Sequence, residues 1–196
     1  FFLQRRKTHF EFPTGLETPH TKSTGNCPMD CGLCDQHLNT PCMVNIDLTN
    51  RCNLNCPICF ANANASGQVF DLSMEQLGDM LDRTMAIRPR PPLSVHYAGG
   101  EPTIHKDFIP AVQMAKDRGV LDIQVASNGL KFAQSKDFTA RAAEAGLNVV
   151  YLQFDGLSDD IYEQSRGRPL LDTKMQAIEN LRQVGVMVTL VPTIVS

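Results

Sequence analysis

Short apolar runs and longer stretches with helical spacing alternate along most of this chain. Runs rich in Val, Ile and Leu predict five strands, at residues 43–48, 93–97, 122–126, 149–154 and 186–191. Apolar residues spaced three and four apart predict four helices, at about 74–86, 108–118, 136–145 and 173–184. Regular alternation of strand and helix is typical of parallel strands joined by right-handed crossovers. The pattern therefore predicts an α/β fold.

Residues at the ends of the predicted helices support these boundaries. Ser73 and Gln76 form a capping-box pattern at the start of the first helix. Gly119, Gly146 and Gly185 each follow a helix and precede a strand, at the position where glycine commonly ends a helix. Five parallel strands are too few to close an eight-stranded barrel, so we expect a partial barrel.

The cysteines are concentrated in one part of the chain. All seven lie between residues 27 and 59. An odd number of cysteines spaced so closely is not typical of a disulfide framework and indicates metal binding. They divide into a group of four and a group of three, which are Cys27, Cys31, Cys34 and Cys42, and then Cys52, Cys56 and Cys59.

The group of three lies in a loop directly after the first predicted strand. Cys52, Cys56 and Cys59 have the spacing C-x3-C-x2-C. Three thiolates can hold three irons of a [4Fe–4S] cluster, which leaves the fourth iron open to another ligand. The alternative is a zinc site, or a closed iron–sulfur site, with a remote fourth ligand.

The group of four has the composition of a closed site. Cys27, Cys31 and Cys34 repeat the same spacing, and Cys42 follows closely enough to supply a fourth thiolate. A closed site of this kind is structural or relays electrons. We predict a second [4Fe–4S] cluster here, with mononuclear iron or zinc as the alternatives, and His37 could replace one thiolate.

Polar and glycine residues follow the other predicted strands. Gly99-Gly100-Glu101-Pro102 follows the second strand, Ser127-Asn128-Gly129 the third, and Gln153-Phe154-Asp155-Gly156 ends the fourth. Parallel sheets place their ligands at the carboxyl ends of the strands. We therefore expect these residues to lie together in the loops at one edge of the sheet.

The three-cysteine spacing and Gly99-Gly100-Glu101-Pro102 together resemble the radical S-adenosylmethionine (SAM) superfamily. This resemblance implies a partial (β/α) barrel, usually of six units, so with five strands we expect a piece of a longer protein. It implies that SAM binds the open iron and is reductively cleaved to a 5′-deoxyadenosyl radical, which abstracts hydrogen from a substrate. The implied cofactors are the cluster and SAM, with an electron donor such as ferredoxin or flavodoxin.

The resemblance also assigns SAM-binding residues. It implies that Gly99 and Gly100 meet the SAM amino group, with Glu101 as an ionic partner. The further SAM contacts that it implies are Ser127, Asn128, Gln153, Asp155 and Arg166. The residues alone leave other interpretations open, namely a turn carboxylate for Glu101, an Asn-Gly turn at Asn128 and a surface salt bridge for Arg166.

Several segments resemble a narrower subgroup of that superfamily. They are residues 27–34 with Cys42, and residues 49–63, 151–156 and 190–193. The subgroup contains tetraether lipid synthases, which join lipid hydrocarbon tails, and relatives proposed to methylate a pterin precursor. We predict C–C bond formation on a lipid chain, with pterin methylation as the alternative. A non-catalytic iron–sulfur electron carrier and a zinc-stabilised binding module are the alternatives from other classes.

Composition adds bounds on partners and location. The net charge of −3 gives no indication of nucleic-acid binding, and no apolar stretch has membrane-spanning length. Free thiols fit a reducing cytoplasm. The family resemblance implies a small-molecule or lipid substrate. We predict a cysteine-rich segment over residues 1–42 and a core domain over 43–196. His96 and His105, which flank the Gly-Gly-Glu loop, are interpreted as structural histidines.

Overall fold

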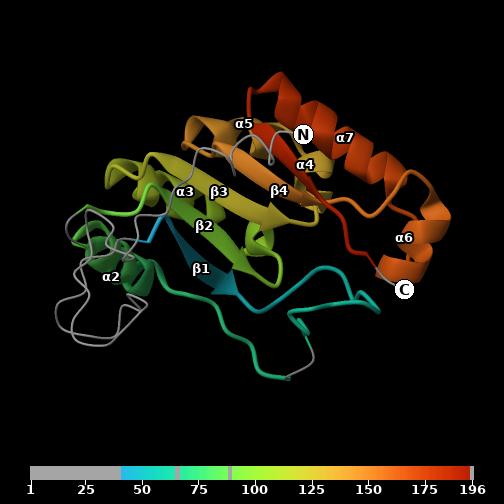
Figure 1. Cartoon of the computed structure of the whole chain (residues 1–196), viewed down its shortest axis with the longest axis horizontal. Coiled ribbons are helices and arrows are strands. Elements are labelled where there is room, and N and C mark those ends of the chain that lie inside the picture. The colour runs from blue at the N-terminus through green and yellow to red at the C-terminus, as the bar shows by residue number, and fades with distance from the viewer. Residues whose placement is uncertain (1–40, 65–66, 88–89, 195–196) are drawn as a thin grey trace, which may run out of the picture.

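A single parallel sheet is the centre of the molecule (Figure 1). The computed structural model describes residues 41–64, 67–87 and 90–194. Within these residues the strands lie in the order β1-β2-β3-β4-β5, and each pairs in parallel with the next. Their bounds are Met43–Thr49 (β1), Ser94–Gly99 (β2), Asp122–Ser127 (β3), Val149–Gln153 (β4) and Met187–Val191 (β5).

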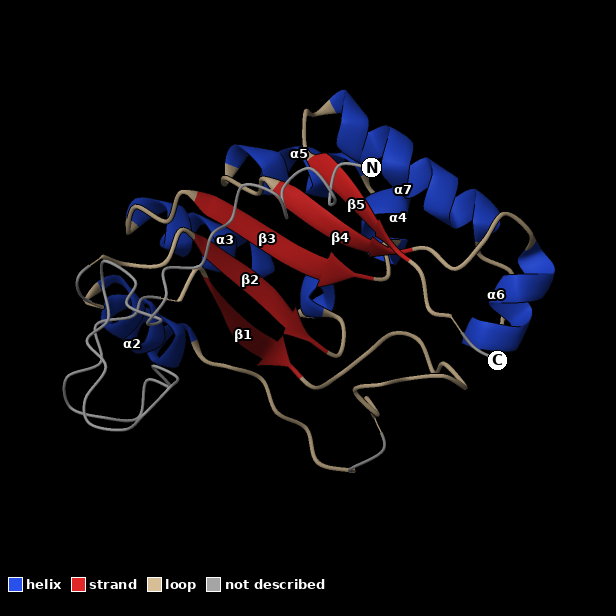
Figure 2. Ribbon diagram, viewed as in Figure 1, coloured by secondary structure: helices blue, strands red, loops and turns tan. Residues whose placement is uncertain are grey.

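Helices cover one face of this sheet (Figure 2). They are α2 (Met74–Met85), α3 (Phe108–Asp117), α5 (Lys136–Glu144) and α7 (Leu171–Gln183). Each predicted strand and helix is therefore confirmed, with bounds that differ by at most two residues. The capping box is present, because Ser73 Oγ accepts from the Gln76 N–H at 3.1 Å and Gln76 Oε1 accepts from the Ser73 N–H at 2.9 Å.

Three short helical segments were not predicted. They are η1 (Pro102–Ile104), α4 (Leu130–Gln134) and α6 (Asp159–Arg166), which follow β2, β3 and β4. They are too short or too polar to show the repeated apolar spacing that identifies a helix. All three lie at the carboxyl end of the sheet, so they shape the candidate site.

The two faces of the sheet have different surroundings. Alternate strand residues such as Ile46, Val95, Tyr97 and Val150 are at most 1% exposed and join the helices in one core. The Tyr97 hydroxyl donates to the Ala111 carbonyl at 2.8 Å, which satisfies its polar end inside that core. The opposite face, which we call the concave face, is not covered by the described helices. This arrangement is the α/β partial barrel that the sequence predicts.

Cys42 lies at the far end of β1 from the three-cysteine loop. Its carbonyl accepts from the N–H groups of Leu93 and Ser94, at 3.0 and 3.2 Å, beside the start of β2. Since β1 has seven residues, about 23 Å of strand separates Cys42 from that loop. The other predicted ligands of the four-cysteine site, Cys27, Cys31 and Cys34, lie outside the described residues, as does most of the predicted segment 1–42.

No helix in the described part of the chain combines the length and apolar character that crossing a membrane requires.

Candidate active site

The loop after β1 carries the three cysteines, and Asn64 holds it together. The Asn64 amide accepts from the Cys52 N–H at 3.0 Å and donates to the carbonyls of Cys52 and Leu54 at 3.1 and 3.3 Å. Asn64 itself has φ +69°, a left-handed conformation that asparagine tolerates better than most residues. These contacts close the loop from its two ends, so one side chain sets its shape.

Backbone and side-chain N–H groups surround two of the cysteine sulfurs. Leu54 N–H donates to Cys52 Sγ at 3.4 Å, and Ala63 N–H donates to Cys59 Sγ at 3.4 Å. Asn128 Nδ2 lies 4.0 Å from Cys52 Sγ. Burial raises the pKa of the Cys52 thiol, so a nearby cation would be needed to hold it as a thiolate.

The Gly-Gly-Glu loop after β2 packs directly against the backbone of the cysteine loop. Gly100 N–H donates to the Thr49 carbonyl at 2.7 Å, and Glu101 N–H donates to the Arg51 carbonyl at 2.8 Å. A Cβ at Gly99 or Gly100 would lie 2.2 Å from one of these carbonyl oxygens. The glycines are therefore required for the contact between two protein segments.

Glu101 is enclosed at the junction of β2 and β3. Its carboxylate accepts from Thr103 Oγ1 at 2.5 Å, Ser127 Oγ at 2.9 Å and the Asn128 N–H at 2.7 Å. Burial raises the pKa of Glu101, although these hydrogen bonds favour the ionised form. With 1% of its surface exposed, this carboxylate holds strand ends in place.

Asn128 connects the end of β3 to the cysteine loop. Its Nδ2 donates to Asn53 Oδ1 at 2.7 Å, and its Oδ1 accepts from the Leu130 N–H at 3.0 Å. It therefore lies beside Cys52.

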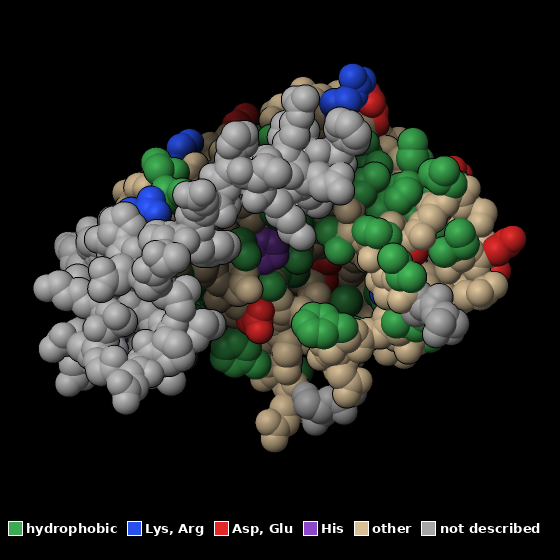
Figure 3. All heavy atoms as spheres, viewed as in Figure 1, with side chains coloured by type: hydrophobic (Ala, Val, Ile, Leu, Met, Phe, Trp, Pro, Cys, Tyr) green, Lys and Arg blue, Asp and Glu red, His purple; other side chains and the backbone are tan. Residues whose placement is uncertain are grey.

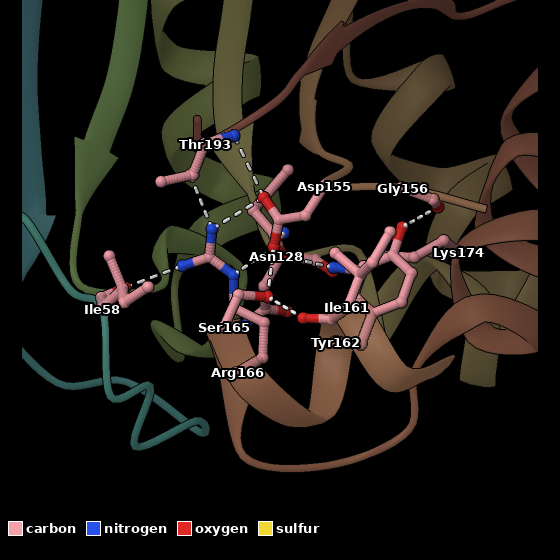
Figure 4. Close-up of polar contacts among 11 residues, drawn as sticks. Ile58, Asn128, Asp155, Gly156, Ile161, Tyr162, Ser165, Arg166, Lys174 and Thr193 are labelled. Carbon is pink, nitrogen blue, oxygen red and sulfur yellow. Dashed lines mark hydrogen bonds and ion pairs between the residues drawn. The ribbon is translucent and has the colours of Figure 1, made fainter. Parts of the chain in front are cut away.

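Asp155 and Arg166 form a buried ion pair between β4 and α6 (Figure 4). Arg166 Nε and Nη2 contact the two Asp155 oxygens at 2.6 and 2.8 Å, and the side chains are 7% and 1% exposed. Burial alone would raise the pKa of Asp155, but the hydrogen bonds from Arg166 and its neighbours hold that pKa well below its ordinary value.

The same guanidinium joins segments that are far apart in sequence. Arg166 Nη1 donates to the Ile58 carbonyl in the cysteine loop at 2.9 Å, and Nη2 donates to Thr193 Oγ1 after β5 at 2.7 Å. Thr193 N–H in turn donates to Asp155 at 3.1 Å. The pair thereby ties the cysteine loop to the ends of β4 and β5.

Lys174 is a buried cation that was not among the predicted site residues. It lies on α7, is 0% exposed, and donates to the Asn128 carbonyl at 2.6 Å and to Gln153 Oε1 at 2.7 Å. Burial lowers its pKa to about 8, against the attraction of Asp155 and Glu101. Figure 4 shows its side chain extending toward Asn128.

The residue range 46–195 matches the family described as the Radical SAM superfamily. This chain belongs to the radical SAM superfamily.

Among curated relatives, the 7,8-dihydro-6-hydroxymethylpterin dimethyltransferase of Methanocaldococcus jannaschii is 44% identical over 194 residues, 98% of this chain and 38% of that protein. A probable GTP 3′,8-cyclase of the same organism is 26% identical over 119 residues, 61% of this chain and 38% of that protein. The chain thus spans less than two fifths of the length of these relatives.

Solved structures share the radical SAM fold of this chain. Methylornithine synthase (PylB) superposes with a TM-score of 0.62 at 21% identity, over 76% of this chain and 43% of that chain. Streptococcus suis SuiB bound to S-adenosylmethionine superposes with a TM-score of 0.63 at 20% identity, over 78% of this chain and 34% of that chain. At these identities the comparison concerns the fold alone.

The cysteine loop fits the [4Fe–4S] cluster that radical SAM membership implies. A cluster takes one thiolate per iron, and N–H groups directed at the sulfurs are a usual surrounding for such ligands. No three His, Cys, Asp or Glu side chains of the described ranges are gathered closely enough to hold a single metal ion. In such a cluster, the sulfurs of Cys52, Cys56 and Cys59 would each bind a different iron.

The structure brings all the predicted SAM-binding residues to the carboxyl end of the sheet, but it gives most of them partners within the protein. Glu101, Asp155 and Arg166 are each satisfied by neighbouring groups. Their roles as SAM contacts stay predictions. Asn64 and Lys174 were missed. A lysine at an inward position of α7, three residues before Ala177, was a signal that could have identified the latter.

Proposed function

We propose that this chain is the catalytic core of a radical SAM enzyme in which Cys52, Cys56 and Cys59 hold a [4Fe–4S] cluster. When bound, the cluster and SAM supply a 5′-deoxyadenosyl radical that abstracts hydrogen from the substrate. The observation that carries this proposal is the contact of the three-cysteine loop with Gly99 and Gly100. Cys42 lies at the opposite end of β1, which separates it from the other three cysteines.

The residues of this chain keep that site rigid. Arg166 anchors the cysteine loop at the Ile58 carbonyl, and Asn128 places an amide beside Cys52. Glu101 connects the loops after β2 and β3 through buried hydrogen bonds. We infer that the predicted SAM contacts, from Gly99 to Arg166, surround the bound SAM with protein groups whose positions are already set.

We favour methyl transfer to a pterin precursor as the reaction. The support is the relative with 44% identity, whose name states that activity. The concave face also presents polar side chains suited to a heterocycle, among them Asn45, His96, Gln124, Tyr151 and Thr189.

Coupling of lipid hydrocarbon tails is the second candidate. Large apolar side chains are exposed on the loops that follow β1, β4 and β5, and these loops border the carboxyl end of the sheet. They are Phe60, Val69, Phe70, Leu157 and Ile194. Figure 3 shows hydrophobic side chains around the hollow on the concave face. An apolar border of this kind suits a hydrocarbon chain.

The first experiment tests the cluster and its open iron. The protein is reconstituted with iron and sulfide without oxygen, reduced, and measured by electron paramagnetic resonance with and without SAM. We expect a cluster signal that changes on SAM addition, and Cys56→Ala should lose this SAM-responsive signal. Cys42→Ala, the matched variant outside the loop, should keep the SAM-responsive signal. A cluster whose signal does not respond to SAM would favour the alternative that this chain is a non-catalytic electron carrier.

The second experiment decides between substrates. Methyl-labelled SAM is supplied with a low-potential ferredoxin or flavodoxin, and with either 7,8-dihydro-6-hydroxymethylpterin or a phospholipid. Label in the pterin supports methyl transfer, whereas a product with joined lipid tails and no label supports coupling. Metal analysis of the same protein also tests the proposed four-cysteine site, which should add four irons if it holds a cluster and one iron or zinc if it does not.

A further inference from the structure

One histidine lies on the concave face, where the proposed reaction would take place. His96 is in β2 between Val95 and Tyr97, which both point into the core and are 0% exposed. His96 therefore points to the opposite face, and it is half-buried. Its register partners are Asn45 in β1 and Gln124 in β3, so three polar side chains form one row.

Hydrogen bonds around Gln124 decide which nitrogen of His96 carries the proton. Asp122 accepts from Ser94 Oγ at 2.8 Å and from the Gln124 amide nitrogen. Because a carboxylate only accepts, the Gln124 amide must direct its NH2 group toward Asp122. Its oxygen is then left for His96, whose Nδ1 lies 3.3 Å away. An amide oxygen cannot donate, so His96 Nδ1 must carry a proton.

The other ring nitrogen remains available. In the neutral imidazole with Nδ1 protonated, Nε2 is a hydrogen-bond acceptor. Nε2 has no hydrogen-bond partner among the residues that the structure describes. The ring is held in place by Gln124 on one side and by Tyr151, whose ring lies edge-on with a centroid distance of 5.0 Å. The protein therefore fixes the orientation of the acceptor.

We propose that His96 Nε2 accepts a hydrogen bond from an N–H or O–H group of the substrate, and that the Asp122–Gln124 pair sets its tautomer. This inference rests on the proposed function, because it assumes a substrate on the concave face. His96 precedes Gly99 by three residues, or about 10 Å of strand. A heterocycle bound between His96 and the Gly-Gly-Glu loop would therefore be close to His96 and also close to SAM bound at that loop. The ring N–H and amino groups of a pterin are donors of the required kind.

The tautomer can be measured without substrate. Nitrogen-15 NMR of histidine-labelled, cluster-loaded protein at alkaline pH distinguishes protonated from unprotonated ring nitrogens, and His96→Gln identifies the signal. We expect the Nδ1-protonated form for His96. Gln124→Met removes the acceptor at Nδ1 and should shift the population toward the Nε2-protonated form. An Nε2-protonated His96 in the unaltered protein would overturn the proposal.

Binding tests the contact itself. Titration with 7,8-dihydro-6-hydroxymethylpterin should show about tenfold weaker binding for His96→Phe, while His96→Gln, which keeps an acceptor, should lose much less. Iron content and circular dichroism verify that each variant is folded and loaded. Equal affinity of His96→Phe and the unaltered protein would overturn the contact. Unaltered protein that cleaves SAM without binding the pterin would refute the pterin contact. Failure to cleave SAM would refute only the proposed function, because the NMR result is independent of it.

Discussion

Lys174 provides a quantitative test of the electrostatics beneath the site. Its pKa is about 8 in the folded protein, against an ordinary value of 10.5, because the ammonium group is buried on α7. Between these two pH values the unfolded chain binds a proton that the folded chain has released. The free energy of unfolding therefore rises with pH across this window. Below pH 8 both states are protonated and the contribution is constant.

The size of the effect follows from the two pKa values. Relative to neutral pH, titration of Lys174 should add about 1 kcal/mol at pH 9 and about 2–3 kcal/mol at pH 10 to the free energy of unfolding. Lys174→Met abolishes this term. It also leaves the Gln153 and Asn128 oxygens without their donor, so the absolute stability of the variant can change in either direction. The prediction concerns the difference between the two proteins as the pH changes.

The assay is urea unfolding of cluster-loaded protein without oxygen, at pH 7, 8, 9 and 10. As the pH rises, the free energy of unfolding of the unaltered protein should increase relative to that of Lys174→Met. Lys106→Met, which removes a lysine whose side chain is 82% exposed, controls for the loss of a positive charge as such. Parallel pH profiles for the unaltered protein and Lys174→Met would refute the reasoning.

Three further predictions concern the contacts that hold the cysteine loop. Arg166→Met should lower the free energy of unfolding by about 3 kcal/mol, because Asp155 loses its buried cation. Adding Asp155→Asn to this variant should restore most of that loss. If the single and the double variant lose the same free energy in urea unfolding, the ion-pair argument is contradicted. Gly100→Ala should cost about 3 kcal/mol, since its Cβ would lie 2.2 Å from a carbonyl oxygen, whereas Gly119→Ala, with open space at φ +82°, should cost about 1 kcal/mol. Asn64→Ala should cost about 1–2 kcal/mol and speed iron release to a chelator, and an unchanged release rate would argue against its role in closing the loop.

The secondary structure was predictable because the local signals are strong. The Ser73 capping box and the glycines after three helices act through neighbouring residues, and the structure confirms them. Apolar periodicity identified the strands and the longer helices for the same reason. The helices α4 and α6 were not predicted because their stability comes from packing at the carboxyl end of the sheet, and no local sequence pattern indicates that packing.

The sequence predicted where the site residues lie better than it predicted which groups they contact. Parallel strands bring their carboxyl ends together, so Glu101, Asp155 and Arg166 could be expected near the cysteine loop. Which groups they contact depends on side chains from distant segments, such as Thr193 and Ser127. The sequence therefore could not reveal that Arg166 and Asp155 neutralise each other, or that Gly99 and Gly100 face the backbone of β1 and its loop.

By itself, the sequence determined the cysteine spacing, the alternation of strands and helices, and hence the family and fold of this protein. These features depend on short-range chemistry, namely the spacing of thiolates and the periodicity of apolar residues. The tertiary structure alone decided the burial of Lys174, the closure of the loop by Asn64 and the tautomer of His96. Each of these depends on hydrogen bonds and desolvation between residues that folding brings together, and the local pattern along the chain does not specify the partners in such contacts.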